Sequence, residues 1–117
     1  MNGDESAVIF GMDARRYLCS DLVVVKKATG SCVVNLEEIG EKMAVFEAEF
    51  PFEYHEQLCL EGGEEQFHGF VSSVEEHEFG WRVEMEFSPL TPWSLARFRP
   101  EHLLDLEGFV QNLPKLE

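Results

Sequence analysis

The chain has 117 residues, and 23 Asp+Glu against nine Lys+Arg give it a formal net charge of −14 at pH 7. This length fits one domain with its own core, and 44% hydrophobic residues, ten of them Phe, exclude a disordered acidic tail. The charge argues against nucleic acids and anionic membranes as partners, because both bind through attraction to basic surfaces. A small dianionic ligand is compatible only with a local basic pocket.

The N-terminal region and the cysteines indicate a cytoplasmic protein. Residues 1–14 lack the basic start and long apolar core of a secretory signal, and no apolar run approaches the roughly 18 residues of a membrane span. The cysteines are odd in number and have no C-x-x-C spacing, which is typical of reduced thiols: Cys19, Cys32 and Cys59. Residues 7–10 are expected to form either a short edge strand or a segment packed over the fold.

The first half of the chain predicts three strands. Residues 22–26 and 32–36 read as a hairpin joined by a turn at residues 28–31. Residues 43–50 form the next strand, which ends at Pro51 because proline cannot donate to a ladder. Its alternation predicts an inner face of Ala44, Phe46, Ala48 and Phe50 and an outer face of Val45, Glu47 and Glu49.

Three more strands follow. Residues 57–61 and 64–74 are expected to pair across a Gly62-Gly63 turn, because tight hairpin turns need positive φ. Gly69 inside the longer arm predicts a bulge or sharp bend. After a turn at residues 75–80, residues 81–87 alternate cleanly, with an expected inner face of Trp81, Val83, Met85 and Phe87.

The pattern changes to helical signals after the sixth strand. Thr91-Pro92 reads as an N-cap followed by proline at the first helical position, which predicts a short helix through Arg97. A second helical stretch is expected over residues 101–106, ended by Gly108, with a frayed tail from residue 114. Trp81 is expected in the core, whereas Trp93 fits either the core or a partner surface.

Six strands with short connections predict an all-β fold, a small antiparallel barrel or sandwich with C-terminal helical cover. The predicted division is an N-terminal segment (1–14), the β-domain (15–98) and a C-terminal helix and tail (99–117).

No motif for catalysis or metal binding is present. The chain lacks G-x-S-x-G, P-loop, G-x-G-x-x-G and H-E-x-x-H patterns, and its four histidines have no metal-ligand spacing. Adjacent glutamates such as Glu37-Glu38 sit at strand ends and turns, where a solvated acidic rim is the expected role. We therefore predict no enzymatic activity, no cofactor and no metal.

Arg15-Arg16, directly before the first strand, is the most unusual local feature. Two adjacent guanidiniums can hold a phosphate or carboxylate in a planar fork, although they can also simply solubilise the N-terminus.

The order of these pieces resembles a PilZ domain, a six-stranded antiparallel barrel known as a receptor for cyclic di-GMP. The resemblance covers roughly residues 14–98: an Arg-Arg pair, a Val-rich strand, a hairpin, a Gly-Gly hairpin, a long strand, and residues 83–87, similar to the family's closing "G-V-x-F"-like pattern. Family members carry R-x-x-x-R before the first strand and [D/N]-x-S-x-x-G near the end of an early strand. These motifs hold the ligand's phosphates and guanines.

Both motifs are altered here. Counting from Arg16 places Ser20 at the second arginine position, and counting from Arg15 places Cys19 there. The second motif aligns either with residues 38–43, where all three key positions are changed, or with residues 35–40, which keep Asn35 and Gly40 but carry Glu37 for serine. We favour the frame that starts at Glu38, because residues 44–46 then continue the strand as in the family.

Two functions follow from the resemblance. The first is a PilZ-like module of bacterial cyclic di-GMP signalling whose ligand site is degenerate and which acts through an unknown protein partner. The second is a genuine receptor for cyclic di-GMP or a related nucleotide, binding through Arg15 and Arg16. The candidate ligand-binding residues are Arg15, Arg16, Asn35 and Glu38. Each lost charge-assisted contact is worth about 1.5–3 kcal/mol, so several losses together favour the first function.

Overall fold

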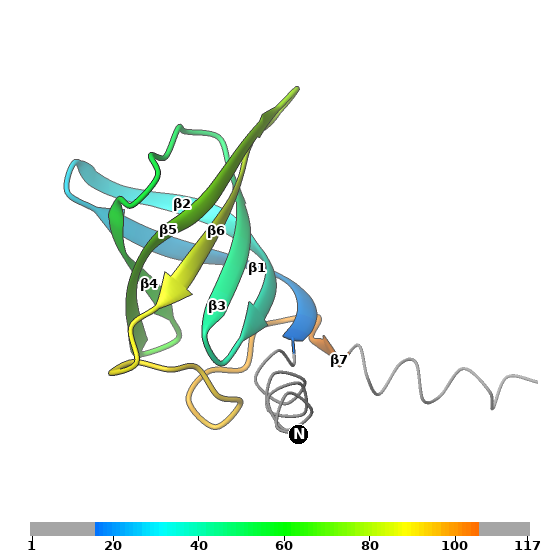
Figure 1. The fold of residues 1–117 in the computed structure, drawn as a ribbon. Coiled ribbons are helices and arrows are strands. Elements are labelled where there is room, and N and C mark those ends of the chain that lie inside the picture. The colour runs from blue at the N-terminus through cyan, green and yellow to red at the C-terminus, as the bar shows by residue number, and fades with distance from the viewer. Residues whose placement is uncertain (1–15, 106–117) are drawn as a thin grey trace, which may run out of the picture.

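The computed structural model describes residues 16–105 of the chain. This part forms six antiparallel strands closed into a barrel, with a short seventh strand at its side (Figure 1). The strands are β1 (Arg16–Lys27), β2 (Gly30–Gly40), β3 (Met43–Ala48), β4 (Gln57–Gly62), β5 (Glu65–His77), β6 (Gly80–Phe87) and β7 (Leu104–Asp105).

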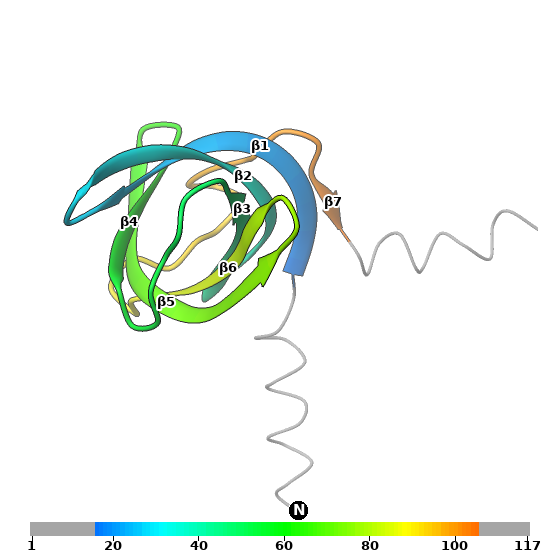
Figure 2. The same ribbon diagram turned by 90° about the horizontal axis from the view of Figure 1, so that it is seen from above.

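The barrel runs in the order β1–β2–β3–β6–β5–β4 and closes where β4 pairs with β1. Figure 2 shows the strands arranged around this ring. The predicted hairpin at the start of the chain is present, with Leu22 opposite Asn35 in the register of β1 and β2. The prediction of an all-β, six-stranded antiparallel fold is thus confirmed as a barrel rather than a sandwich.

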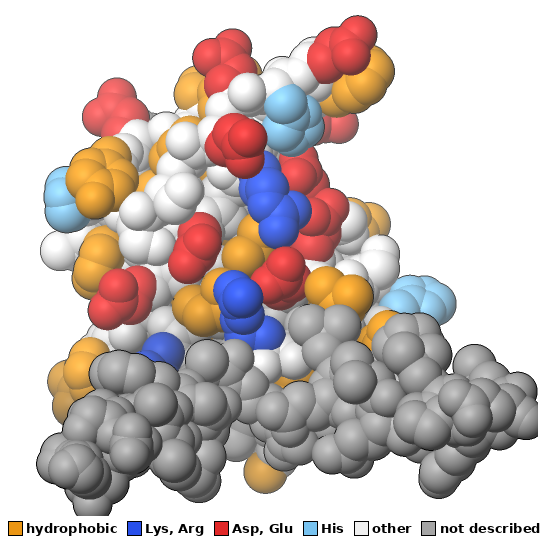
Figure 3. Space-filling model, turned by 45° about the vertical axis from the view of Figure 1, so that its right-hand side comes forward, with side chains coloured by type: hydrophobic (Ala, Val, Ile, Leu, Met, Phe, Trp, Pro, Cys, Tyr) orange, Lys and Arg blue, Asp and Glu red, His pale blue; other side chains and the backbone are white. Residues whose placement is uncertain are grey.

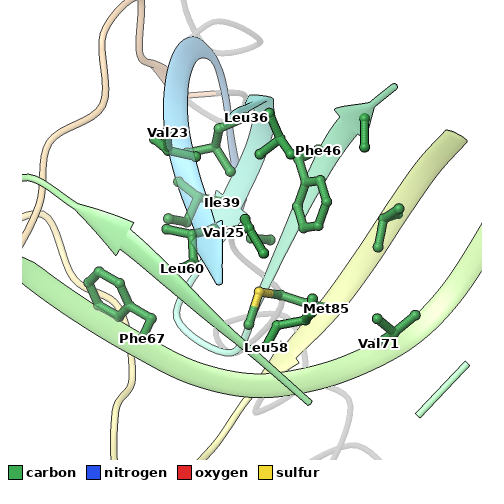
Figure 4. Packing of buried hydrophobic residues seen from close by; sticks show 14 of the residues in the cluster. Val23, Val25, Leu36, Ile39, Phe46, Leu58, Leu60, Phe67, Val71 and Met85 are labelled. Carbon is green, nitrogen blue, oxygen red and sulfur yellow. The ribbon is translucent and has the colours of Figure 1, made fainter. Parts of the chain in front are cut away.

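The core fills the inside of the ring with apolar side chains from all six strands (Figure 4). The alternation of β6 is confirmed, because Val83, Met85 and Phe87 are buried and Trp81 packs against the core. Phe46 on β3 and Phe67 on β5 are the largest fully buried side chains of the core. Burying a side chain of this size contributes about 1.5–3 kcal/mol to the stability of the barrel.

The prediction for the third strand needs a correction at its end. Ala44, Phe46 and Ala48 point inward as expected, but the strand ends at Ala48 and Phe50 is 55% exposed. Ala48 is the last residue that pairs with β6, opposite Trp81, and the chain bends away before Pro51. Val45, expected on the outer face, is buried as well.

The Gly-Gly hairpin lies one residue later than predicted. Gly62 is the last residue of β4, and the turn is formed by Gly63 and Glu64, with Gly63 at a φ of 61°. Gly62 is needed for another reason, because a Cβ atom there would lie 2.5 Å from the ring of Phe98. Gly69 similarly permits a close approach, since its Cβ would collide with the backbone oxygen of Glu86.

The sharp irregularity predicted near Gly69 lies slightly further along β5. Gly69 keeps its pairing with both neighbouring strands, and the register shift against β6 occurs between Val71 and Ser73. β5 also extends through His77, so the turn predicted at residues 75–80 is confined to Glu78 and Phe79.

The helix predicted from Thr91 to Arg97 is absent. The segment is a loop with one turn, in which the amides of Arg97 and Phe98 both donate to the carbonyl of Ser94. Burial of Trp93 overrides the local helix signal: its amide donates to Glu41 and its indole N–H donates to the carbonyl of Phe98 at 2.8 Å. The loop runs under one end of the barrel (Figure 1), and Trp93 belongs to the core.

The second predicted helix is absent over its described residues, 101–105. His102 has a φ of 57°, which interrupts a right-handed helix, and Leu104 then pairs with Leu18 as part of β7. No helix in residues 16–105 is long and apolar enough to cross a membrane. Arg15, residues 7–10, Gly108 and the tail from residue 114 lie outside the described residues.

Candidate functional site

Arg82 on the outer face of β6 lies at the centre of a cluster of charged side chains. Its guanidinium donates to Glu37 at 2.7 Å and to Glu38 at 3.3 Å, and it lies 3.7 Å from Glu47. The three glutamates come from β2 and β3 because β3 lies between β2 and β6 in the sheet. We call Arg16, Arg82, Glu37, Glu38 and Glu47 the ion cluster.

The register of the strands explains why Glu37 and Glu38 both reach Arg82. The pairing of β2 with β3 shifts between Leu36 and Glu38, which indicates a β-bulge. Leu36 and Ile39 are both fully buried, so the two residues between them point to the same, outer face. The bulge therefore places two adjacent carboxylates where regular alternation would place one.

Two of the candidate residues meet within this cluster. Arg16 lies at the start of β1, with its Nη1 atom 3.5 Å from Oε1 of Glu38. Glu38 therefore lies between the two guanidiniums, and its side chain is only 18% exposed. Three carboxylates surround two cations, so the cluster carries no excess positive charge to attract an anion.

Asn35 lies near the cluster but contacts a different residue. The hydroxyl of Ser20 lies 3.5 Å from the side-chain oxygen of Asn35. Ser20 and Asn35 belong to the two segments that resemble the ligand motifs, so these segments lie side by side on β1 and β2. Arg15, the fourth candidate, lies outside the described residues.

Cys19 on β1 lies close enough to the cluster for its pKa to respond to the carboxylates there. Burial is the largest cause, and with the negative charges of Asp21, Glu38 and Glu37 it raises the pKa of this thiol to about 12. The smaller, coulombic part of this shift comes from carboxylates, which make the surroundings of the thiol negative. The same environment disfavours a dianionic ligand.

Histidine and metal chemistry add little to this site. His77 lies 2.6 Å from Glu47 and so connects the cluster to the end of β5. Within residues 16–105, no three His, Cys, Asp or Glu side chains are grouped so that they could hold a metal ion.

On the face shown in Figure 3, acidic side chains surround the few Lys and Arg side chains. Chemically, this arrangement neutralises charge within the chain.

Arg82, Glu37 and Glu47 are the members of the cluster that the sequence analysis did not select as ligand-binding residues. The alternation of residues 81–87 places Arg82 on the outer face, where it is the single cation beside Glu84 and Glu86. That isolation is the signal that could have drawn attention to it. Its partners on β2 could not be deduced, because they depend on the order of the strands around the barrel.

Comparisons with protein-family models, with curated proteins and with solved structures find no match for this chain.

Proposed function

We propose that the chain is a non-enzymatic, PilZ-like barrel whose nucleotide site is closed by internal ion pairs and which acts as a protein-interaction module in cyclic di-GMP-type signalling. One observation carries this proposal: the guanidinium of Arg16 pairs with a carboxylate from β2, and that of Arg82 pairs with carboxylates from β2 and β3. A ligand carrying two phosphates would have to displace these carboxylates and stay beside them.

The arrangement of the altered motifs supports the resemblance. Arg16 and Ser20 on β1 lie beside Glu38 and Asn35 on β2, so the segments similar to the two ligand motifs are in contact. A six-stranded antiparallel barrel is also the fold that the resemblance implies. The side chains at the key positions have changed while their relative placement suits a shared site.

The energetic argument favours loss of the ligand. Removing one charge-assisted contact costs about 1.5–3 kcal/mol, and about 1.4 kcal/mol corresponds to a tenfold change in affinity. Ser20 in place of an arginine and Glu37 in place of a serine, in the frame that starts at Asn35, remove one favourable contact and add one repulsive charge. Together they move binding from micromolar values to undetectable ones.

The test is calorimetric titration of cyclic di-GMP into the wild type and into a variant with repaired motifs. Because the structure places Asn35 beside Ser20, the repair uses the frame that starts at Asn35 rather than the one that starts at Glu38. Ser20→Arg/Glu37→Ser/Glu38→Gln restores R-x-x-x-R and N-x-S-x-x-G and removes two carboxylates of the ion cluster. Thr29→Arg/Glu64→Ser/Glu53→Gln is the matched control, because it changes the net charge equally at exposed positions elsewhere. We expect no heat with the wild type or the control and binding of about micromolar affinity with the repaired variant.

Two results would contradict the proposal. Micromolar binding by the wild type that is lost in Arg16→Ala would make the chain a genuine receptor. Absence of binding by a folded repaired variant would remove the support for a former nucleotide site at these residues.

A further inference from the structure

The barrel has an open groove at the end opposite the loop that contains Trp93. The hollow measures about 460 Å³ and is lined by apolar Leu22, Val33 and Phe79 and by polar Glu47, Glu49 and His77, among others. We call it the apolar groove. Its volume would accept a few side chains of a larger partner.

The apolar side chains of the groove are unusually accessible. Leu22 is 70% exposed, Val33 is 60% exposed and Phe79 is 82% exposed. Single exposed apolar residues are normal on protein surfaces, but three that gather in one hollow from three different elements mark an interaction site. None of the three is needed to fill the barrel core.

The fold itself creates the groove. β2 pairs with β3 only from Asn35 onward, and β3 ends at Ala48, so the two strands separate beside Val33. The β5–β6 hairpin extends beyond the rest of the barrel (Figure 1), and Phe79 lies in its turn. Within residues 16–105, β2 has no strand partner on that side over residues 30–34. An extended segment could use this open edge for main-chain hydrogen bonds.

The charge of the groove selects the occupant. Glu49 lines the hollow, and the β5–β6 hairpin adds exposed Glu76 and Glu78 nearby in the chain. Glu47 lines it too, but its carboxylate already lies beside Arg82 and His77. A second copy of the chain, itself at −14, would be repelled. A cationic partner would be attracted and oriented by the same charges.

We propose that the apolar groove binds an extended, cationic segment of a partner protein and seats that segment's apolar side chains against Leu22, Val33 and Phe79. This inference rests on the proposed function in one respect, namely that the chain acts through a protein partner. It goes further by assigning the surface and the chemistry of the segment that binds there.

The experiment selects binders for the full chain from a displayed library of random 12-residue peptides, and then measures the affinity of the most enriched peptide by fluorescence anisotropy. Leu22→Ser/Phe79→Ser removes two apolar contacts of the groove. Tyr54→Ser/Leu90→Ser is the matched control, because both residues are exposed and lie outside the groove. Glu49→Gln, compared with Glu64→Gln on the β4–β5 turn, tests the charge at equal net charge.

We expect enriched peptides that interleave Lys or Arg with apolar residues. The groove variant should weaken binding about tenfold or more, and the control pair should leave it within about twofold. Glu49→Gln should weaken binding more than Glu64→Gln does. In amide NMR spectra of the wild type, the peptide should shift the signals of Val33, Ala48 and Phe79.

The proposal is overturned if the enriched peptides are neutral or acidic, if the groove variant binds them as well as the wild type does, or if no peptide is enriched. The NMR shifts decide the question without any variant, because shifts confined to residues outside the groove would also overturn it. If the groove proposal fails, the result of titrating cyclic di-GMP into the wild type is unaffected. Failure of the proposed function would instead appear as binding of cyclic di-GMP.

Discussion

The ion cluster and the apolar groove share Glu47, yet they differ in whether their side chains have partners within the chain. In the cluster, each guanidinium has carboxylate partners within the chain, at distances of 2.7 to 3.7 Å. In the groove, three bulky apolar side chains face solvent. The cluster pairs its charged side chains with one another, whereas the groove leaves its apolar side chains without partners in the described residues.

This difference shows where to look for function in a chain whose segments only partly resemble known ligand motifs. Residues that resemble a known motif can persist with their charges consumed by internal partners, as Arg16 and Glu38 do. Exposed apolar surface has no such internal compensation, because water is a poor partner for it. A partner protein is the simplest way to cover it.

The largest difference in stability is expected between a variant of the buried Trp93 and a variant of the exposed Phe79. Trp93→Ala should lower the free energy of unfolding by about 3–5 kcal/mol, because it opens a cavity in the core. It also removes an edge-to-face contact with Tyr17 at 5.5 Å and the hydrogen bond to Phe98. Phe79→Ala should change stability by less than about 0.5 kcal/mol, since its ring is mostly exposed. Urea denaturation followed by circular dichroism measures both.

A comparable loss in the two variants would contradict the comparison. It would mean that Phe79 contributes to the packing of the barrel and is not available for binding a partner.

An intermediate effect is expected for the ion cluster. Arg82→Gln leaves Glu37, Glu38 and Glu47 close together without their shared cation, which should cost about 1 kcal/mol because the pairs are partly exposed. The loss should shrink in high salt, since mobile ions screen the remaining repulsion. Urea denaturation at low and high salt measures it, and Glu49→Gln in the groove is the control, with no loss expected.

A salt-independent loss for Arg82→Gln would point to packing of its side-chain stem rather than to charge. The absence of any loss would show that the cluster is a loose surface network.

The strands and the inner face of the barrel could be predicted from sequence because alternation depends only on local geometry. Val83, Met85 and Phe87 point inward as their spacing indicates. The turn after β4 lies one residue later than predicted. Gly62 was assigned to the turn, but it leaves room for the ring of Phe98, and a contact so distant in the sequence cannot be predicted from local pattern. The prediction of a helix at residues 91–97 was wrong for a similar reason, since burial of Trp93 outweighs the capping signal of Thr91-Pro92.

The candidate site was predictable only in part. Arg16 and Glu38 were selected through the altered motifs, and they do meet. Arg82 was missed because its partners are set by the pairing of β3 with both β2 and β6. The groove was missed because it exists only where β2 and β3 separate beside the β5–β6 hairpin, an arrangement that no local pattern describes.

The smallest expected effect concerns Cys19, whose pKa is about 12 against an ordinary value of 9.0. Because the folded-state pKa is raised, the protonated thiol contributes stability that is fully present below pH 9 and is lost as the pH rises toward 12. Thiolate absorbance in a Cys32→Ala/Cys59→Ala background measures this pKa directly. Burial is its main cause and the carboxylates are secondary. Glu37→Gln/Glu38→Gln should therefore lower it only in part, and Glu49→Gln in the groove should leave it unchanged. An equal shift from Glu49→Gln would mean that the thiol senses the net charge of the whole chain, and the cluster and the groove would then not be electrostatically distinct.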